Sequence, residues 1–248
     1  MRPLRVVLHA HSNWSYDGHW ELAEIARLFS RFGVDAVMMT EHDTGFPADR
    51  FDEYRAACAS ASTGKCRLIP GIEYSDPGND IHILTWGLDR FLGEGRAVEA
   101  TLEDVRAAGG AAIFAHPARR DAWRLFREPW AEFLDGIEIW NRKTDGVAPG
   151  AEALKLQART GLAPTVGIDF HRGRHFYPLD HLVNVPEGIG PESLETALVG
   201  AIRAGQLAPR AWRRSLIGKA GNLPDRYPAH QALEKTRQMM RALRPRRR

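Results

Sequence analysis

The sequence predicts a single α/β domain, built as a closed barrel of parallel strands that alternate with helices. Short apolar runs alternate with longer helix-like segments over nearly the whole chain. Several of these runs are apolar at consecutive positions, as expected for parallel strands covered on both faces. About seven or eight strand–helix units favour a closed barrel over an open doubly wound sheet.

The expected elements follow one another in a regular order. Strands are expected at residues 5–9, 34–40, 68–72, 81–86, 111–115, 136–140, 164–168 and 181–185. Helical patterns occupy residues 20–32, 51–62, 95–108, 150–160 and 191–204. The pattern weakens after Gly205, and residues 227–243 are expected to form one terminal helix.

The composition is that of an ordinary globular protein. Hydrophobic residues make up 44% and charged residues 26% of the 248 residues, enough for one large domain with a buried core. The N-terminal segment lacks the pattern of a secretory signal, and no run approaches the roughly 20 apolar residues that span a bilayer. We therefore expect a soluble, cytoplasmic protein. Cys58 and Cys66 lack Cys-x-x-Cys spacing and are expected to be reduced and structural.

The net charge of +3 belongs to the C-terminal tail. Residues 234–248 hold seven of the 34 Lys and Arg residues and one of the 31 Asp and Glu residues, which leaves 27 basic and 30 acidic residues elsewhere. We expect one domain over residues 1–233, including part of the terminal helix. The remaining residues are then the end of that helix and a basic tail, more often a solvated end than a contact for nucleic acid or a partner.

Residue types that bind metal ions occur at the ends of most expected strands. They are His9, His11, His42, Glu73, His116, Asp169 and His171, whereas His82 lies inside its expected strand. The C-terminal ends of barrel strands converge on one face, so we expect a shared site. A strand also places residues two apart on the same face, so His9 and His11 can bind one ion. A lone strand histidine is more often a core residue, but a set of this size is hard to explain in that way.

In these segments the sequence resembles the PHP (polymerase and histidinol phosphatase) family of metallophosphoesterases. The matching segments are Leu8-His9-Ala10-His11-Ser12, Ser15-Tyr16-Asp17-Gly18, Thr40-Glu41-His42-Asp43-Thr44, Gly71-Ile72-Glu73, His82, Ala115-His116-Pro117 and Gly167-Ile168-Asp169-Phe170-His171. They occur in order and at family-like spacing over residues 4–185. The resemblance implies a distorted barrel of seven strands, with a metal site at the C-terminal ends of the strands.

The resemblance also implies up to three metal ions and nine ligands. The first ion would be held by His9, His11, Glu73 and Asp169. Glu73 would bridge to a second ion, completed by His82 and His116. The third ion would be held by Asp17, His42 and His171. The chain departs from the family at Glu41, where Asp usually precedes the histidine; this change is expected to affect the support of the ligands or the pocket shape.

The ligand types point to a hydrolase of phosphate mono- or diesters. Imidazole and carboxylate ligands without thiolate favour Zn, Mn or Fe and do not choose among them. Paired ions of this kind activate hydroxide for attack on phosphorus and neutralise the phosphoryl oxygens. Asp43 or a metal-bound water could protonate the leaving alcohol, although Asp43 could equally cap the following turn.

Other residues near the ligands are candidates for contact with substrate. Arg172 is predicted in the catalytic site because it follows His171, and an arginine fork binds phosphate bidentately. Further basic residues after expected strands are Arg119, Arg120, Arg142, Lys143 and Arg174, with solvated loop charge as the alternative. Glu138, inside an expected strand, should support the ligands. The aromatic residues near the motifs, which either stack on a substrate ring or pack in the core, are Trp14, Tyr16, Trp20 and Phe46.

Three alternatives stay open from the sequence. The substrate is a phosphorylated small molecule or a nucleotide in the main hypothesis, and an oligonucleotide end if the chain is a nuclease. The His-x-His pair also resembles amidohydrolases that cleave C–N bonds, which usually place a lysine on a central strand where this chain has Glu73. A non-enzymatic module that binds nucleic acid through its basic tail is disfavoured by the intact set of nine ligands.

Overall fold

The structure, a computed structural model, describes residues 1–218 together with 223, 227, 230–232 and 236. Its strands are β1 (Arg2–Ala10), β2 (Ala36–Met39), β3 (Glu41–His42), β4 (Arg67–Ile69), β5 (Gly71–Ser75), β6 (His82–Trp86), β7 (Ala111–Phe114), β8 (Gly136–Asn141), β9 (Ala163–Gly167), β10 (Leu179–Val185), β11 (Ala208–Ala211) and β12 (Arg214–Ser215). Its α-helices are α1 (Leu22–Arg31), α2 (Phe51–Ala61), α3 (Val98–Ala107), α4 (Arg142–Asp145), α5 (Ala151–Thr160) and α6 (Pro191–Arg203). Short 3₁₀ turns are η1 (Ala48–Arg50), η2 (Arg119–Arg124), η3 (Glu128–Glu132) and η4 (Gly173–His175).

The α/β class predicted from the sequence is confirmed. Every expected strand and helix up to residue 204 has a counterpart, whereas the hairpin of β11 and β12 was not predicted because its sequence has few apolar residues. The expected terminal helix at 227–243 and the basic tail at 234–248 lie mostly outside the described residues. The proposed domain end at residue 233 lies there too and stays a prediction.

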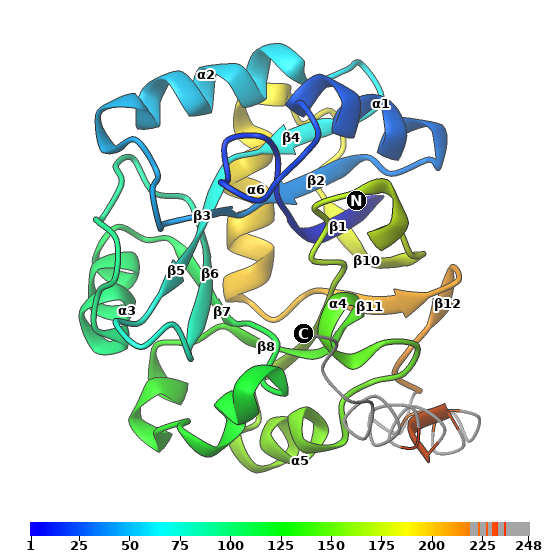
Figure 1. Cartoon of the computed structure of the whole chain (residues 1–248). Coiled ribbons are helices and arrows are strands. Elements are labelled where there is room, and N and C mark those ends of the chain that lie inside the picture. The colour runs from blue at the N-terminus through cyan, green and yellow to red at the C-terminus, as the bar shows by residue number, and fades with distance from the viewer. Residues whose placement is uncertain (219–222, 224–226, 228–229, 233–235, 237–248) are drawn as a thin grey trace, which may run out of the picture.

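The strands form two six-stranded sheets, with the orders β12-β11-β10-β1-β2-β4 and β3-β5-β6-β7-β8-β9. Helices α1, α2, α3 and α5 lie around the outside, and α6 lies behind the strands (Figure 1). Two neighbouring strands of the first sheet continue directly into two neighbouring strands of the second. Only Thr40 separates β2 from β3, and only Pro70, which has no N–H for the ladder, separates β4 from β5.

The sheets also meet where the segment after β9 runs beside β1. The His11 N–H donates to the Phe170 carbonyl at 2.8 Å, and the Phe170 N–H donates to the His9 carbonyl at 3.2 Å. Successive neighbours therefore lead from β1 through β2–β3, β4–β5, β6, β7 and β8 to β9 and back to β1. This arrangement is compatible with the distorted seven-strand barrel that the resemblance implied.

The expectation of parallel strands throughout is wrong. β6 pairs antiparallel with both β5 and β7, and β10 pairs antiparallel with β1 and with β11. The connection from β5 to β6 spans only residues 76–81, which is too short for the crossover that a parallel pair needs. An apolar run shows that a strand is buried on both faces but not the direction in which it runs.

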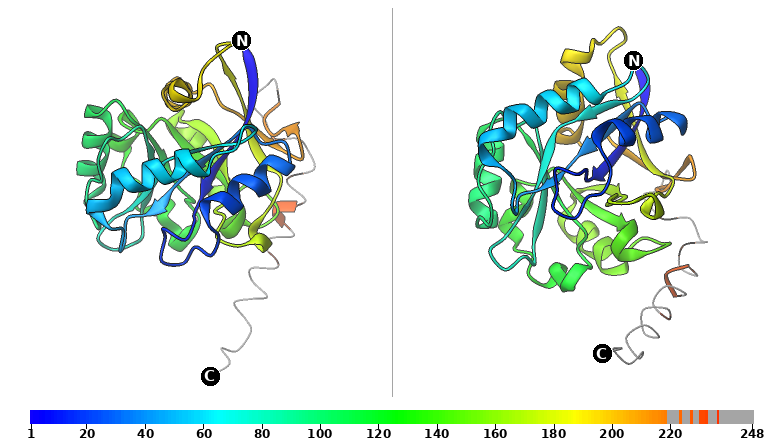
Figure 2. Two further views of the ribbon diagram at one scale, coloured as in Figure 1. Left: turned by 90° about the horizontal axis from the view of Figure 1, so that it is seen from above. Right: turned by 45° about the horizontal axis from the view of Figure 1, so that its top comes forward.

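Alternate residues of β1 pack into two different hydrophobic clusters, as the two-residue period of a strand requires. Leu4, Val6 and Leu8 pack in a cluster with apolar residues of α6. Val7 and Ala10 pack in the cluster that contains α1. Figure 2 (left) shows α6 near the N-terminal end of β1, whereas the loop after β1 lies at the opposite end. The core thus leaves the C-terminal end of β1 free for a site.

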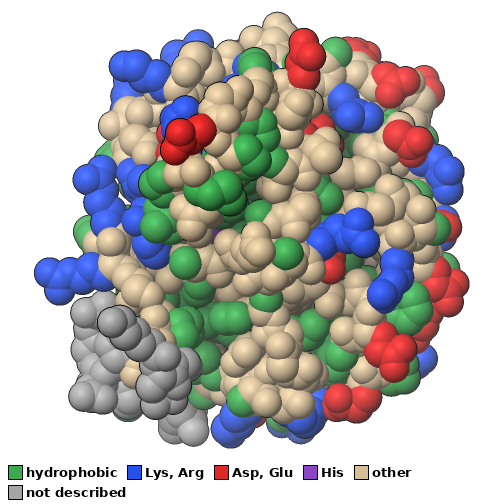
Figure 3. Space-filling model, turned by 180° about the vertical axis from the view of Figure 1, so that it is seen from behind, with side chains coloured by type: hydrophobic (Ala, Val, Ile, Leu, Met, Phe, Trp, Pro, Cys, Tyr) green, Lys and Arg blue, Asp and Glu red, His purple; other side chains and the backbone are tan. Residues whose placement is uncertain are grey.

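Seen from behind, Lys and Arg side chains predominate along the left edge of the view, acidic and basic side chains are mixed on the right, and histidine side chains scarcely show (Figure 3). No helix in the described part of the chain is long and apolar enough to cross a membrane. Cys58 and Cys66 are both buried and free, as expected from their spacing.

The close approach of β5 to its neighbours gives a test of the fold. A Cβ at Gly71 would lie 2.3 Å from Trp86 Cδ1 and 2.5 Å from the carbonyl oxygens of Met39 and Thr85. Gly71→Ala is therefore expected to lower the free energy of unfolding by about 2 kcal/mol in urea denaturation. The control is Gly200→Ala on α6, where a Cβ meets no atom within 4 Å and stability should be unchanged or slightly higher. Equal stability of the two variants would contradict the packing described here.

Candidate metal centre

Three candidate ligands have an unusual backbone conformation. His9, His116 and Asp169 adopt positive φ angles of 67°, 27° and 53°, a region that residues other than glycine seldom occupy. At His9 the conformation interrupts the pairing of β1 with β2, where the register shifts between Leu8 and Ala10. Strain of this kind costs about 1–3 kcal/mol per residue and is concentrated at functional sites.

The sequence predicted that plain strand alternation would bring His9 and His11 to one face. The structure brings both to one carboxylate, but by a bulge at His9, while His11 lies just after the end of β1. Their Nε2 atoms lie 3.3 Å and 3.2 Å from Glu73 Oε2. The expected meeting of the two histidines is therefore confirmed, by a different local geometry.

Glu73 lies at the centre of the cluster and is 1% exposed. Its Oε2 atom faces His9, His11 and His42, with His42 Nδ1 at 3.3 Å. Its Oε1 atom faces a second pair, with His82 Nδ1 at 2.6 Å and His116 Nε2 at 2.8 Å. The two oxygens of one carboxylate thus address two separate sets of imidazoles.

The antiparallel direction of β6 explains the place of His82. Ser75 at the end of β5 pairs with His82 at the start of β6, so the first residue of β6 lies at the same edge as the last residue of β5. A histidine that seemed to lie inside a strand is therefore at the same mouth as the other ligands.

Asp169 adds a second carboxylate beside the first two histidines. Its Oδ1 lies 3.7 Å from His9 Nε2 and 3.6 Å from His11 Nε2. Ligand atoms of His9, His11 and Asp169 lie within 4.8 Å of one another, as do those of His9, Glu73 and His116. The two groups share His9 and adjoin at Glu73.

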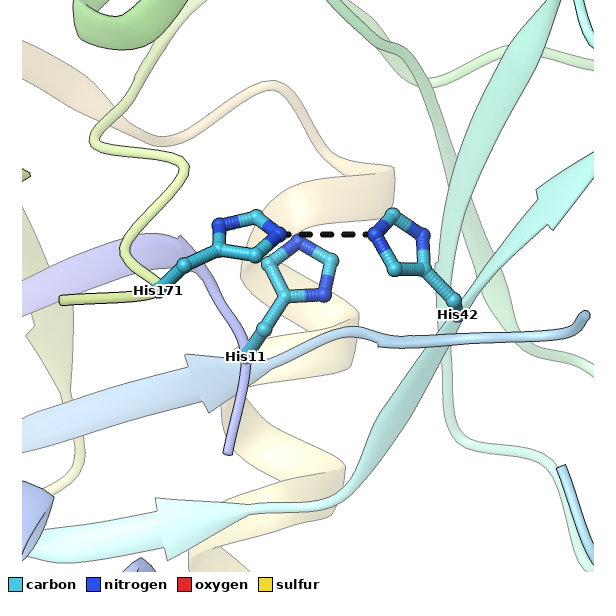
Figure 4. Close-up of side chains that lie close together, drawn as sticks. All are labelled: His11, His42 and His171. Atoms are coloured by element: carbon cyan, nitrogen blue, oxygen red, sulfur yellow. Dashed lines mark hydrogen bonds between the residues drawn. The ribbon is translucent and has the colours of Figure 1, made fainter. Parts of the chain in front are cut away.

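A third group is formed by His11, His42 and His171 (Figure 4). The three rings point toward one another from the end of β1, from β3 and from the loop after β9, with His171 Nε2 3.4 Å from His42 Nε2. Asp17 joins them, since its Oδ1 lies 3.3 Å from His42 Nε2 and its Oδ2 lies 3.1 Å from His171 Nε2. All nine residues expected as ligands are therefore together, and His11 lies between the first and third groups.

The charges of the cluster are interdependent. Burial would raise the pKa of Glu73, but the charges of His9 and His82 outweigh it and hold that pKa well below its usual value. Burial would lower the pKa of His9, but Glu138, Glu73 and Asp169 raise it well above its usual value. Burial also would lower the pKa of His171, but hydrogen bonds with Asp169 and Asp17 raise it to about 9. Without metal, protonated imidazoles therefore compensate the buried carboxylates.

The residues fit divalent ions. Burial and the neighbouring His171 and His42 hold the pKa of His11 well below its usual value, so its ring is neutral and offers a lone pair. Its buried Nε2 atom has no hydrogen-bond partner. A neutral buried imidazole, crowded by carboxylate oxygens and further imidazoles, is the donor set that Zn, Mn and Fe accept. His11 thus has a buried nitrogen lone pair without a hydrogen-bond partner at a position where a metal ligand is expected.

Two buried glutamates hold the ligands in place. Glu138 Oε1 accepts from His9 Nδ1 at 2.9 Å, and its Oε2 accepts from the His116 N–H at 2.8 Å. Asn141 Nδ2 also donates to Glu138 Oε2, at 3.0 Å. A partner on the second ring nitrogen fixes which nitrogen of His9 faces the site. The support expected from Glu138 is therefore present.

Glu41 holds the loop that carries Asp17. Its oxygens accept from the Ser12 N–H and hydroxyl, and from the Ser15 hydroxyl at 2.5 Å. Ser15 in turn accepts from the His42 N–H at 3.0 Å. Glu41, which stands where the family usually has Asp, therefore supports this loop and does not lie among the candidate ligands.

Asn79 is a site residue that the sequence analysis missed. Its Oδ1 accepts from His82 Nε2 at 2.6 Å, which leaves Nδ1 of His82 facing Glu73. Arg119 donates to the Asn79 carbonyl at 2.7 Å and so anchors this turn. The signal available was the Asp-Pro-Gly-Asn-Asp turn at residues 76–80, shortly before His82, and Asn141, directly after an expected strand, was missed in the same way.

Among the described residues, neither side chain predicted as catalytic hydrogen-bonds to a candidate ligand. The Asp43 carboxylate accepts from the Gly95 N–H at 2.9 Å, so it holds a loop distant in sequence and not the following turn that the sequence analysis considered. The Arg172 side chain is exposed and makes no hydrogen bond or ion pair with the described residues. Lys143, in contrast, reaches the ligands: its Nζ lies 3.3 Å from both Asp169 Oδ1 and His171 Nε2.

The aromatic residues near the motifs divide into packed and exposed ones. Trp14 packs against Phe46 and Tyr54, with ring centroids 6.1 Å and 5.4 Å apart. Trp20 packs edge-on against Phe170. Tyr16 is different, because it is 71% exposed beside the ligands. Phe46 is therefore a core residue, Trp14 and Trp20 are partly buried against the core, and Tyr16 is the most exposed of the four.

The chain is an α/β protein with a buried cluster of histidines and carboxylates. Comparison with solved structures shows which known proteins have the same fold. No family model matches the sequence, and no curated protein matches it significantly. A Bacteroides vulgatus two-domain protein containing a predicted PHP-like metal-dependent phosphoesterase matches 85% of this chain at 18% identity, with a TM-score of 0.63. PsfC from Pseudomonas syringae matches 97% of the chain at 13% identity, with a TM-score of 0.60, over 99% of its own length.

A lesion-specific endonuclease from Pyrococcus furiosus is similar as well, over 87% of this chain at 13% identity and a TM-score of 0.59. The chain spans 65% of the length of the Bacteroides protein and 58% of the length of the endonuclease. The chain has the fold of the PHP-like metal-dependent phosphoesterases, as the sequence resemblance predicted.

The raised pKa of His171 gives a test in metal-free protein. A group whose pKa rises from 6.5 in the unfolded chain to about 9 in the folded one stabilises the fold fully below pH 6.5, and this stability is lost as the pH rises through 9. We expect the free energy of unfolding of chelator-treated protein to fall by about 3 kcal/mol over this range. In urea denaturation, the free energy of unfolding of His171→Gln should fall less over this pH range than that of the wild type. The control His19→Gln, at an exposed position, should fall as much as the wild type. Identical pH curves for all three proteins would contradict a raised pKa of His171.

Proposed function

We propose that this chain is a metal-dependent phosphoesterase that hydrolyses a phosphate mono- or diester. The observation that carries the proposal is the position of Glu73, whose Oε2 faces His9, His11 and His42 while its Oε1 faces His82 and His116. A carboxylate with two separate sets of imidazoles suits a ligand that bridges two ions. Its place on a central strand, where amidohydrolases usually have a lysine, favours phosphate esters over C–N bonds.

The nine clustered residues divide into three proposed ion sites. His9, His11, Glu73 and Asp169 would hold the first ion, and Glu73, His82 and His116 the second. Asp17, His42 and His171 would hold the third. Zn, Mn or Fe suits such donors. Divalent ions bound there would supply neutralisation of charge on the phosphoryl group and activation of water as the nucleophile.

The chain itself would bind and orient the phosphate through Lys143. This residue follows Asn141, whose side-chain oxygen accepts from the Lys143 N–H at 3.1 Å and so fixes the start of α4. The Lys143 side chain is 40% exposed, and its ammonium lies against Asp169 and His171. A cation that reaches the ligands from a fixed helix start and is open to solvent can contact both the cluster and an incoming anion.

A nuclease acting on oligonucleotide ends is the second candidate. The observation in its favour is the exposure of Arg172 and Arg174, which directly follow the ligand His171. Exposed arginines beside the centre are suited to the backbone phosphates of a polynucleotide. The similar fold of a lesion-specific endonuclease agrees with this candidate. Protonation of the leaving alcohol by Asp43 stays a prediction, since the Gly95 N–H donates to only one of its two carboxylate oxygens.

The metal requirement is tested by removing and restoring the ions. Chelation should abolish phosphate release, and added Zn, Mn or Fe should restore it. Glu73→Gln should lower kcat/KM by about 1000-fold or more, because one amide cannot replace a carboxylate shared by two ions. Glu152→Gln, an exposed glutamate on α5, is the matched control and should behave like the wild type.

The substrate panel combines phosphate monoesters, diesters, 5′- and 3′-phosphorylated oligonucleotides and C–N substrates. Phosphate release that survives chelation, or metal-dependent cleavage of C–N bonds alone, would reject the proposal. Elemental analysis of the same samples gives the number of ions in each chain.

The role of Lys143 is tested by its conservative and non-conservative variants. Lys143→Met removes the charge but keeps the length, and should lower kcat/KM by about 10- to 100-fold, mainly through a higher KM. Lys143→Arg should recover part of this loss, and inorganic phosphate should inhibit Lys143→Met more weakly. Lys155→Met on α5 is the control. If Lys143→Met instead changes only the metal content, the lysine supports the ion site and does not bind phosphate.

A further inference from the structure

Tyr16 is an exposed aromatic side chain that the metal centre does not use. Five large hydrophobic residues are exposed in the described part of the chain: Met1, Tyr16, Phe32, Leu125 and Trp212. Of these, only Tyr16 adjoins a candidate ligand in sequence, Asp17, and packs against another, His42. Its exposure leaves a flat, amphipathic ring beside the candidate ligands open to contact with a ligand.

One face of the Tyr16 ring is covered and the other is open. The ring stacks on the imidazole of His42, with centroids 5.2 Å apart and planes inclined by 26°. The residue is nevertheless 71% exposed, so the face turned away from His42 meets solvent. A flat surface of this size stands directly over a candidate ligand of the third ion.

The loop holds the ring in a fixed position. On one side, the Ser15 hydroxyl donates to Glu41 at 2.5 Å. On the other, Asp17 contacts His42 and His171, and a Cβ at Gly18 would lie only 1.7 Å from the Ser12 carbonyl oxygen. The residues on both sides of Tyr16 are therefore fixed by contacts, and little conformational entropy would be lost when a ligand packs on the ring.

Tyr16 and Lys143 contact neighbouring imidazoles of the third group. The Tyr16 ring stacks on His42, whose Nε2 lies 3.4 Å from His171 Nε2, and Lys143 Nζ lies 3.3 Å from that same nitrogen of His171. An ester bound by Lys143 would therefore carry its alcohol group toward this ring.

We propose that Tyr16 is the stacking platform for a planar heterocycle of the substrate, and that the site therefore prefers nucleotide esters to esters without a base. This inference rests on the proposed function. A base offers a π-face to an aromatic side chain whatever its identity, so the platform would select for a base without selecting among bases. The other aromatic residues near the motifs are less suited, because Phe46 is buried in the core and Trp14 and Trp20 are partly buried and pack against it.

The test compares AMP with ribose 5-phosphate, which carries the same phosphate and sugar without the base. In metal-loaded wild-type protein we expect kcat/KM to be at least about 10-fold higher for AMP. Tyr16→Phe keeps the ring and should keep this ratio within about twofold. Tyr16→Leu removes the ring and should lower the ratio about 5- to 50-fold, mainly through the KM of AMP. Trp212→Leu replaces another exposed ring, on the turn between β11 and β12, and should not change the ratio.

Several outcomes would overturn the inference. A wild-type ratio near one, or a ratio that Tyr16→Leu leaves unchanged, excludes a platform for a base. A loss of hydrolysis in Tyr16→Phe for both substrates assigns the phenol hydroxyl a chemical role instead. Calorimetric binding of AMP and ribose 5-phosphate is the second readout. If neither ester is hydrolysed but wild type binds AMP more tightly and Tyr16→Leu does not, the phosphoesterase proposal fails while the platform stands.

Discussion

The burial of the Glu73 carboxylate among histidines is the interaction on which the rest of the site depends. An isolated charge in a protein interior is very costly, so a carboxylate that is 1% exposed needs cations or metal ions on every side. Here His9, His11, His42, His82 and His116 all contact its two oxygens. These histidines come from four segments and Glu73 from a fifth, so the chain must bring together the ends of β1, β3, β5, β6 and β7. The arrangement of strands and the chemistry of the centre are two aspects of the same constraint.

The chain holds this constraint in place with strained backbone and buried support. His9, His116 and Asp169 have positive φ angles, and each is a candidate ligand. Glu138 fixes the ring of His9 and the backbone of His116 with one carboxylate. A second carboxylate, Glu41, fixes the loop that presents Asp17. The free energy stored in these positions is offset by hydrogen bonds that are available only in the complete fold.

Two side chains beside the candidate ligands have different proposed functions. Lys143 is the cation that reaches the ligands, and Tyr16 is the exposed ring beside them. The first can recognise the phosphoryl group that all candidate substrates share. The second can distinguish between them by what the phosphate is attached to. Recognition of the phosphate and choice of substrate would therefore reside on different elements, α4 and the loop after β1.

The sequence by itself determined the fold class and the candidate ligands, because strand periodicity and the chemical type of a residue are local properties. Residues of metal-ligating type at the ends of most expected strands need no coordinates to be noticed, and the family resemblance added Asp17 to them. Only the tertiary structure decided that β6 runs antiparallel, which places His82 at the mouth, because burial on both faces does not record direction. It also decided that Asp43 caps a loop, that Asn79 orients His82, and that only Tyr16 of four nearby aromatic residues is exposed. These outcomes depend on which distant segments pack beside each residue, and a single sequence does not state those neighbours.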